Sequence, residues 1–271
     1  MKPIIKYQGG KSRELSLIKT LSPHTTDRVI EPFCGGAAVS FGLEKPSVLS
    51  DLNHQVSNLY KTVADDDLYP QLANKIEEYK TYEHDDLSKI FYEARDVINS
   101  PIDDNDPLTK AISYVVVRQL CFSGMERYNS KGEFNVPFGH YKKMSCNLSD
   151  EHHNFLKTCD VREGNFSDLF EGLSSTDFVF LDPPYLERLG YIKGDGGSGL
   201  HEELLECCKS TDAKWMIVHS DHEFYRSEYK NFHIETNDFG YSQRFGKGKT
   251  HDNAKVRHLY IMNYELPPVF S

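Results

Sequence analysis

Strand-like and helical segments alternate at both ends of this 271-residue sequence, and this alternation limits the possible fold more than any other feature. Strand-like runs with short connections lie at 28–31, 47–51, 178–182, 214–219, 231–238 and 256–264. Helical patterns lie at 37–44, 54–64, 200–209 and 222–229. Strands that alternate with helices predict a doubly wound, mostly parallel α/β sheet, with 256–264 as one arm of a hairpin.

The alternation stops between residues 66 and 144. Helical periodicity with little strand signal covers 68–80, 87–98 and 108–120, and the polar, glycine-containing stretch 124–139 that follows is typical of a β-hairpin. We therefore predict a Rossmann-like domain made of residues 1–65 and 145–271. The inserted segment 66–144 is predicted to be a separate, mainly helical domain that ends in a β-hairpin.

Composition predicts a globular intracellular protein. Hydrophobic residues make up 38% of the chain, no apolar run approaches the roughly 20 residues that span a bilayer, and the N-terminus lacks the apolar region of a signal peptide. The six cysteines have no CxxC spacing, so we expect reduced packing residues instead of zinc ligands or disulfides. The histidines, including His152 and His153, are expected on the surface. We predict no metal site and a cytoplasmic location.

The charge distribution does not decide whether the partner is a nucleic acid. A net charge of −10 argues mildly against phosphate binding. Basic residues nevertheless gather around 127–143 and again at 244–257, which is compatible with one basic face.

The tetrapeptide Asp182-Pro183-Pro184-Tyr185 directly follows the apolar run 178–181. Consecutive prolines remove two amide donors and leave nearby carbonyls free to accept hydrogen bonds. A carboxylate, such a carbonyl and an aromatic ring suit a planar group that bears an exocyclic amine, and adenine fits that description. The alternative is an ordinary proline turn with a capping Asp.

A second group of residues suits a nucleoside. The stretch Glu31-Pro32-Phe33-Cys34-Gly35-Gly36 predicts a strand, a tight turn and the start of a helix, but it lacks the GxGxxG pattern of dinucleotide sites. About twenty residues later, the next strand ends in Asp51, where a carboxylate can accept hydrogen bonds from ribose hydroxyls. The alternative role of Asp51 is the N-cap of the following helix.

Two further stretches are weaker candidates for the same ligand. In Tyr7-Gln8-Gly9-Gly10-Lys11, the lysine suits a carboxylate and the tyrosine ring suits an amino-acid moiety, whereas the alternative is a flexible N-terminus. Asn165 and Phe166 offer a polar contact and a ring face for an adenine. The glycine-rich segment 187–199 is either a loop that orders on substrate binding or a plain surface loop.

With these motifs in this order, nearly the whole chain resembles the Dam-type DNA adenine-N6 methyltransferases (D12 class, alpha group). The most specific stretches are Phe122-Ser123-Gly124-Met125-Glu126-Arg127-Tyr128-Asn129 and Gly132-Glu133-Phe134-Asn135-Val136-Pro137-Phe138-Gly139. The resemblance implies a Rossmann-like methyltransferase sheet with an inserted DNA-recognition domain. It also implies S-adenosylmethionine as the cofactor, without a metal.

The resemblance assigns roles to individual residues. The catalytic centre is Asp182, Pro183, Pro184 and Tyr185. The cofactor contacts are Tyr7, Gln8, Gly9, Lys11, Glu31, Phe33, Cys34, Gly35, Asp51, Asn165, Phe166 and Asp182. The DNA contacts are Lys6, Phe122, Ser123, Met125, Arg127, Asn129, Asn135, Pro137, His140, Lys142 and Lys143.

Some of these roles concern the bases. Arg127 corresponds to an arginine that contacts a guanine, Lys6 to a lysine that reaches the outer guanine, and Met125 and Pro137 to positions near a thymine methyl. Phe122 corresponds to a residue near the orphaned partner of a flipped adenine. His140 replaces a common arginine and Ser123 a common asparagine, so the target, GATC or a related site, stays open.

The predicted reaction is methyl transfer to the N6 amino group of an adenine flipped out of duplex DNA. Asp182 and the Pro183 carbonyl would accept the two amino hydrogens while Tyr185 stacks on the base. The alternatives are methylation of another amine (RNA adenine, DNA cytosine or protein glutamine) and an idle DNA-binding regulator. We expect a monomer, with a transient dimer on DNA as the alternative. We also expect a cytoplasmic location, in the cell itself or in the host cell if a phage encodes the protein, and association with the nucleoid when the protein is bound to DNA.

Overall fold

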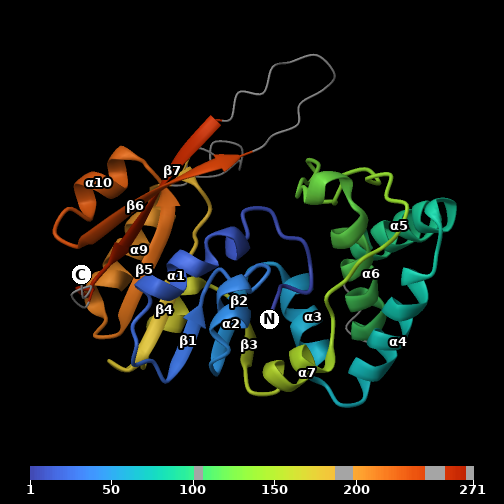
Figure 1. Cartoon of the computed structure of the whole chain (residues 1–271), viewed down its shortest axis with the longest axis horizontal. Helices are drawn as coiled ribbons and strands as arrows, with labels where there is room; N and C mark the ends of the chain where they lie inside the picture. The colour runs from blue at the N-terminus through green and yellow to red at the C-terminus, as the bar shows by residue number, and fades with distance from the viewer. Residues whose placement is uncertain (101–105, 187–197, 242–253, 267–271) are drawn as a thin grey trace. The chain divides into compact units, whose positions relative to one another are not determined.

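A computed structural model describes residues 1–100, 106–186, 198–241 and 254–266 (Figure 1). The chain divides into two compact units. The first unit contains residues 1–20 and 34–165, and the second contains residues 21–33 and 166–271. These units follow contacts within the chain and differ from the predicted functional domains, whose boundaries stay a prediction.

The first unit is mainly helical. Its described elements are η1 (Lys11–Arg13), α2 (Ala38–Leu43), β2 (Ser47–Asp51), α3 (His54–Ala64), α4 (Leu68–Lys80), α5 (His84–Asn99), α6 (Pro107–Leu120), η2 (Phe122–Gly124), α7 (Asp150–Leu156) and β3 (Asp160–Glu163). Strands β2 and β3 pair in parallel, with Val48 opposite Asp160. Helix α1 (Leu15–Leu21) ends at the boundary between the units.

Local signals explain where the helices of the inserted segment begin. Asp106 caps α6 by accepting a hydrogen bond from the Thr109 amide at 2.9 Å, and Pro107 occupies the first turn, where its missing N–H costs nothing. Lys110 anchors the end of α5 by donating to the carbonyls of Val97 and Ser100. Helices α4, α5 and α6 lie side by side (Figure 1) and bury an apolar core.

The second unit contains most of the strands. Its described elements are β1 (Arg28–Glu31), η3 (Phe166–Phe170), β4 (Asp177–Leu181), α9 (Ser198–Ser210), β5 (Lys214–Ser220), α10 (Glu223–Glu228), β6 (His233–Tyr241) and β7 (Ala254–Met262). Their order is β1-β4-β5-β7-β6. The pairs β1–β4 and β4–β5 are parallel, whereas β7 is antiparallel to both β5 and β6.

The placement of β4 determines where the Asp182 motif lies. All five residues of β4 are buried between two parallel neighbours, as expected of a short, continuous apolar run in a parallel sheet. Asp182 is therefore the first residue beyond the carboxyl end of an interior strand. In α/β folds, ligands bind at this end of parallel strands.

The mixed α/β fold, with seven strands among the described residues, confirms the predicted fold class. The predicted helices 54–64 and 68–80 have the bounds of α3 and α4, and the other predicted elements agree to within a few residues. Two short elements, α1 and α7, were not predicted because neither has a long apolar stripe. None of the helices in the described part of the chain is long and apolar enough to cross a membrane.

The predicted hairpin is only partly regular. Over 121–139, a fully described range, isolated antiparallel bridges join Cys121 with Phe138 and Tyr128 with Phe134, but no continuous strand forms. Glycine backbones with positive φ at Gly124 and Gly132 interrupt the extended geometry. The segment is an antiparallel loop pinned at two points, which corrects the expected β-ladder.

Candidate active site and DNA interface

The tyrosine of the Asp182 motif is held by two buried histidines of the second unit. The Tyr185 hydroxyl lies 3.2 Å from Nε2 of His258, and its ring centroid lies 4.8 Å from that of His219. The Leu186 amide, which can only donate, gives its hydrogen bond to Nε2 of His219 at 3.3 Å. His219 is therefore neutral, with its proton on Nδ1, which lies 2.9 Å from the Ser220 carbonyl.

This arrangement corrects the expectation that the histidines lie on the surface. His201, His219 and His258 are fully buried, and His152 is nearly so. Residue spacing gave no sign of this, because His219 and His258 are brought together only by the antiparallel pairing of β5 with β7.

The exposure of the motif itself suits a ligand above the strand end. Asp182 and Tyr185 are partly buried, Pro183 is buried and Pro184 is exposed. In the same unit, the rings of Phe33 and Phe166 stack obliquely, with centroids 5.3 Å apart, and Glu31 is buried at the end of β1.

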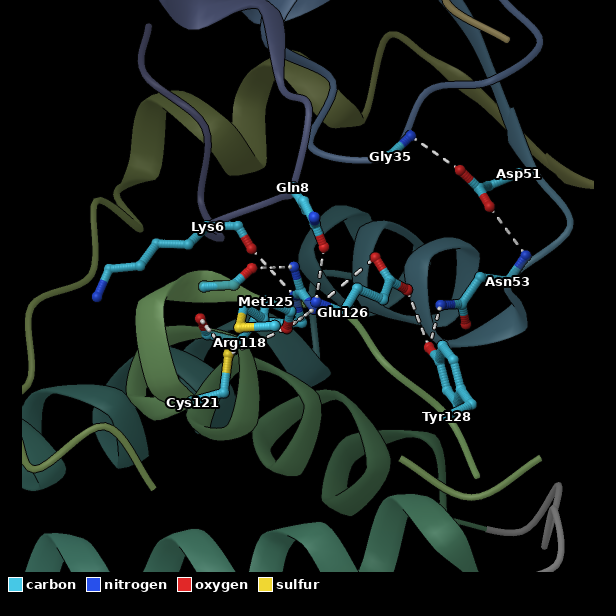
Figure 2. Close-up of polar contacts among 11 residues, drawn as sticks. Lys6, Gln8, Gly35, Asp51, Asn53, Arg118, Cys121, Met125, Glu126 and Tyr128 are labelled. Atoms are coloured by element: carbon cyan, nitrogen blue, oxygen red, sulfur yellow. Dashed lines mark hydrogen bonds and ion pairs between the residues drawn. The ribbon is translucent and has the colours of Figure 1, made fainter. Parts of the chain in front are cut away.

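Asp51 in the first unit has a carboxylate fixed by backbone donors. Its Oδ2 accepts from the Gly35 amide and its Oδ1 from the Asn53 amide, both at 2.9 Å (Figure 2). Burial raises the pKa of Asp51 above its usual value, although both of these hydrogen bonds act to lower it. The N-cap of α3 is Asn53, whose side chain accepts from the Gln55 amide, so the N-cap alternative for Asp51 is wrong.

The N-terminal motif packs against the glycine turn and is not a flexible tail. Lys11 is only 3% exposed, and its ammonium group donates to the Gly9 carbonyl. A Cβ atom at Gly35, where φ is +44°, would lie 2.6 Å from a ring carbon of Tyr7. Only glycine therefore allows the Tyr7 ring to lie over this turn.

Other predicted cofactor residues have defined places in the first unit. The amide of buried Cys34 donates to the Ser50 carbonyl at 2.9 Å. The Gln8 side chain accepts from the Glu126 amide, so it already has a protein partner. Gly9 and Asn165 are exposed.

The loop 121–139 is anchored to α5 by a two-bond clamp. The Asn99 side chain donates to the Phe134 carbonyl at 3.0 Å and accepts from the Phe134 amide at 2.7 Å. At the tip, Oδ1 of Asn129 accepts from the amides of Lys131 and Glu133. Asn129 therefore shapes the turn, and the structure gives its side chain mainly intramolecular partners.

Arg127 is oriented by the opposite side of the same loop. Its Nε donates to Oδ1 of Asn135 at 2.7 Å, and its Nη2 donates to the Asn135 carbonyl at 3.0 Å. Three apolar residues on the same loop are exposed, namely Phe122, Met125 and Pro137. A loop that carries an oriented guanidinium and exposed apolar side chains is suited to base edges.

The remaining predicted DNA contacts are of three kinds. Lys142 and Lys143 are exposed, as phosphate contacts would be. Lys6 is engaged within the protein: its ammonium donates to the Gln119 carbonyl at 2.7 Å and lies 4.1 Å from the Tyr141 ring centroid. Ser123 and His140 have positive φ angles of 58° and 54°, a region where asparagine is several-fold enriched.

Some expectations fall on parts that the structure does not describe. The glycine-rich segment lies outside the described residues over 187–197, and so does the basic segment over 242–253. Among the described residues, no group of three or more His, Cys, Asp or Glu side chains could hold a metal ion.

Comparison with known proteins identifies the family. Residues 7–242 match the family described as D12 class N6 adenine-specific DNA methyltransferase. The chain therefore belongs to this family and is an adenine-specific DNA methyltransferase, with DNA as its substrate.

Individual relatives support the assignment. The type II methyltransferase M.CviBI of Paramecium bursaria Chlorella virus NC1A is 33% identical over 97% of this chain and all of that protein. The type II methyltransferase M.MjaIII of Methanocaldococcus jannaschii is 30% identical over 87% of this chain and 90% of that protein. The DNA adenine methylase of Escherichia coli K12 is 29% identical over 67% of this chain and 64% of that protein.

Proposed function

We propose that this methyltransferase uses S-adenosylmethionine, flips the target adenine out of the duplex, and acts at GATC or a closely related site. The strongest support for the proposal is the orientation of the Arg127 guanidinium by its two hydrogen bonds to Asn135. Membership of the family supplies the reaction, DNA adenine methylation. The residues below supply the reasons for the donor, the flipped base and the site.

The chain offers suitable contacts for the cofactor. Asp51 would accept hydrogen bonds from the ribose hydroxyls, because its carboxylate is fixed in place by two amides. The Tyr7 ring over the Gly35 turn offers an apolar wall, and Phe33 with Phe166 offers aromatic faces. When bound, S-adenosylmethionine supplies a methyl group on a positively charged sulfur.

The Asp182 motif supplies acceptors for an exocyclic amine. The Asp182 carboxylate and the Pro183 carbonyl would accept the two amino hydrogens of the adenine. Those hydrogen bonds draw the nitrogen lone pair out of conjugation with the ring, so it becomes a nucleophile. Tyr185 would stack on the base, and His219 and His258 restrict its ring beforehand. Such a site works by positioning, and the base must leave the stack to reach it.

The Arg127–Asn135 contact supports the reading of guanine. Asn135 occupies Nε and one hydrogen of Nη2, which fixes the plane of the guanidinium. The second hydrogen of Nη2 and the neighbouring hydrogen of Nη1 form a parallel pair on the adjacent edge of the group, and this pair matches guanine O6 and N7. A bidentate contact of this kind discriminates between bases by about 1–3 kcal/mol.

The first experiment tests donor and catalytic centre together. Tritiated S-adenosylmethionine is incubated with adenine-containing duplexes, and the modified base is identified after digestion. Transfer should reach adenine N6, and Asp182→Ala should abolish it while binding of S-adenosylhomocysteine persists. Asp182→Ala activity above roughly a tenth of wild type would contradict the role of Asp182, because a charge-assisted hydrogen bond contributes about 1.5–3 kcal/mol. Duplex binding without transfer would instead support an idle regulator.

A fluorescent adenine analogue tests base flipping. With 2-aminopurine at the target position, extrusion from the stack should raise the emission on binding, and Tyr185→Ala should raise it further by removing the stacking ring. Emission that stays at the level of the free duplex would argue against flipping.

The third experiment tests the target sequence. Arg127→Ala should lower activity on GATC duplexes. The ratio of activity on GATC duplexes to activity on duplexes altered at the contacted guanine should fall by about 5–150-fold, the equivalent of ~1–3 kcal/mol. Lys131→Ala, which removes an exposed cation from the same loop, is the matched control and should weaken all sequences alike. Equal losses on both duplexes in the Arg127 variant would make this residue a backbone contact.

A further inference from the structure

A buried arginine joins the predicted cofactor segment to the predicted DNA-reading loop within the first unit. Arg118, on α6, is 1% exposed. Its Nε donates to the Lys6 carbonyl at 3.0 Å, and its two terminal nitrogens donate to the carbonyls of Gly124 and Met125 at 3.2 Å each (Figure 2). One rigid side chain thus fixes the backbone of both segments.

Glu126 is the second junction between these segments. Its amide donates to the Gln8 side chain at 2.9 Å, and its carboxylate lies 3.8 Å from Nη1 of Arg118. The same carboxylate accepts from the Tyr128 hydroxyl at 2.9 Å. The Glu126 side chain is only 20% exposed, so these contacts are partly shielded from water.

Tyr128 extends the connection to the ribose-binding candidate. Its hydroxyl also accepts from Nδ2 of Asn53 at 3.4 Å. Asn53 caps α3, and its backbone amide donates to Asp51. Figure 2 shows the resulting series of contacts from Arg118 through Glu126, Tyr128 and Asn53 to Asp51.

We propose that Glu126 and Tyr128 are positioning residues that make cofactor binding and DNA binding mutually favourable. The inference rests on the proposed function, in which Asp51 holds the cofactor and the loop around Arg127 reads DNA. A duplex that orders residues 124–128 also orders Gln8 and Asn53, because hydrogen bonds join them. The cofactor then binds more tightly, because the conformational entropy cost of ordering its site is already met. By thermodynamic linkage, bound cofactor raises the affinity for the duplex by the same factor.

The test removes one oxygen atom. Tyr128→Phe deletes the hydroxyl that joins Glu126 to Asn53 and keeps the ring against Phe134, where the centroids lie 5.9 Å apart. Calorimetry gives the dissociation constant of S-adenosylhomocysteine for the free enzyme and for the enzyme saturated with a GATC duplex. The ratio of the two constants is the coupling factor, and S-adenosylhomocysteine prevents turnover during the measurement.

The wild-type enzyme should show a coupling factor of about fivefold or more, within the usual range for linked sites. Tyr128→Phe should lower that factor toward one by about twofold or more, as expected for one lost hydrogen bond. The matched control is Tyr82→Phe, which removes a phenol–carboxylate hydrogen bond to Glu78 in the same unit and should leave the factor unchanged.

A second pair of variants separates coupling from stability. Glu126→Gln keeps an acceptor for the Tyr128 hydroxyl and should retain most of the coupling, whereas Glu126→Ala should lose it. The KM for DNA at low cofactor concentration should rise in Glu126→Ala, while kcat at saturation of both ligands changes much less.

Three results overturn the proposal. These are a wild-type factor near one, an unchanged factor in Tyr128→Phe, and a loss in Tyr82→Phe equal to that in Tyr128→Phe. Failure of the proposed function gives a different result, because S-adenosylhomocysteine would then not bind, or Asp51→Ala would not weaken it. Normal methylation with an unchanged coupling factor in Tyr128→Phe therefore refutes the coupling alone.

Discussion

Replacement of Asp51 by Asn should separate its structural role from its role toward the cofactor. Each carboxylate oxygen accepts one amide hydrogen in the free protein. Asn offers one oxygen and an NH₂ group, so either the Gly35 or the Asn53 amide loses its partner. A buried amide without a partner costs about 1–3 kcal/mol. Removal of a charge whose burial raises the pKa of Asp51 offsets part of this cost, so we expect destabilisation at the lower end of this range.

The loss toward the cofactor should be larger than the loss of stability. Hydrogen bonds from ribose hydroxyls to a carboxylate contribute about 1.5–3 kcal/mol, equivalent to roughly 10–150-fold in affinity. Since Asn retains one acceptor, the Asp51→Asn enzyme should bind S-adenosylhomocysteine about tenfold more weakly, and Asp51→Ala should approach the upper end of this range.

Two measurements check this prediction. Urea unfolding without ligand gives the stability change, and calorimetry gives the affinity for S-adenosylhomocysteine. Asp106→Ala is the matched control, because it removes the cap of α6, costs about 0.5–2 kcal/mol and should leave the affinity unchanged. An Asp51→Asn enzyme with lower stability and wild-type affinity would refute the ribose role and leave Asp51 as a support for the turn.

Three further outcomes are expected. Joint replacement of Lys142 and Lys143 by Ala should weaken binding to every duplex sequence alike and flatten the dependence of the binding constant on salt concentration, measured by fluorescence anisotropy. Arg28→Ala should destabilise the fold by about 1–3 kcal/mol in urea titrations near neutral pH. Burial alone would raise the pKa of Asp177, but hydrogen bonds, including two from Arg28, lower it overall. The stabilisation of the fold by this ion pair is therefore complete above the usual Asp pKa of about 3.9, and it is lost as the pH falls through the lowered pKa of Asp177. Cofactor binding should release protons at pH values above the usual Asp pKa, because hydrogen bonds from the ribose hydroxyls favour the ionised form of Asp51, whose pKa is raised in the free protein. The affinity for the cofactor should therefore rise with pH across that range. Calorimetry in buffers of different ionisation heat measures the proton release, and Asp51→Asn should abolish it.

Local sequence patterns predicted helices and strands well where hydrophobic periodicity and terminal signals alone determined them. The buried strand β4 and its terminal Asp182 followed from a continuous apolar run that ends at two prolines. The bounds of α3 and α4 followed from periodicity together with terminal signals. These features depend on neighbours in sequence, so the sequence alone contains the necessary information.

Contacts between distant residues were not predictable in this way. The N-cap of α3 is Asn53 and not Asp51, because the cap depends on which of these two nearby polar side chains turns toward the Gln55 amide. The burial of His219 and His258 depends on the register of β5 with β7. No local pattern around Arg118 indicated that an arginine in the last turn of α6 would contact the N-terminal segment.

If the loop 121–139 reads DNA as proposed, its exposed apolar side chains have a consequence for the heat of binding. Phe122 is 51% exposed and Met125 is 36% exposed, and Pro137 is exposed beside them. A duplex that covers these side chains removes apolar surface from water, so the heat capacity of the system falls on complex formation. The binding enthalpy then becomes more negative as temperature rises, whereas a complex held by phosphate contacts alone would bury little apolar surface. On the proposed DNA contact, the hydration of these three exposed side chains would be released when the duplex binds.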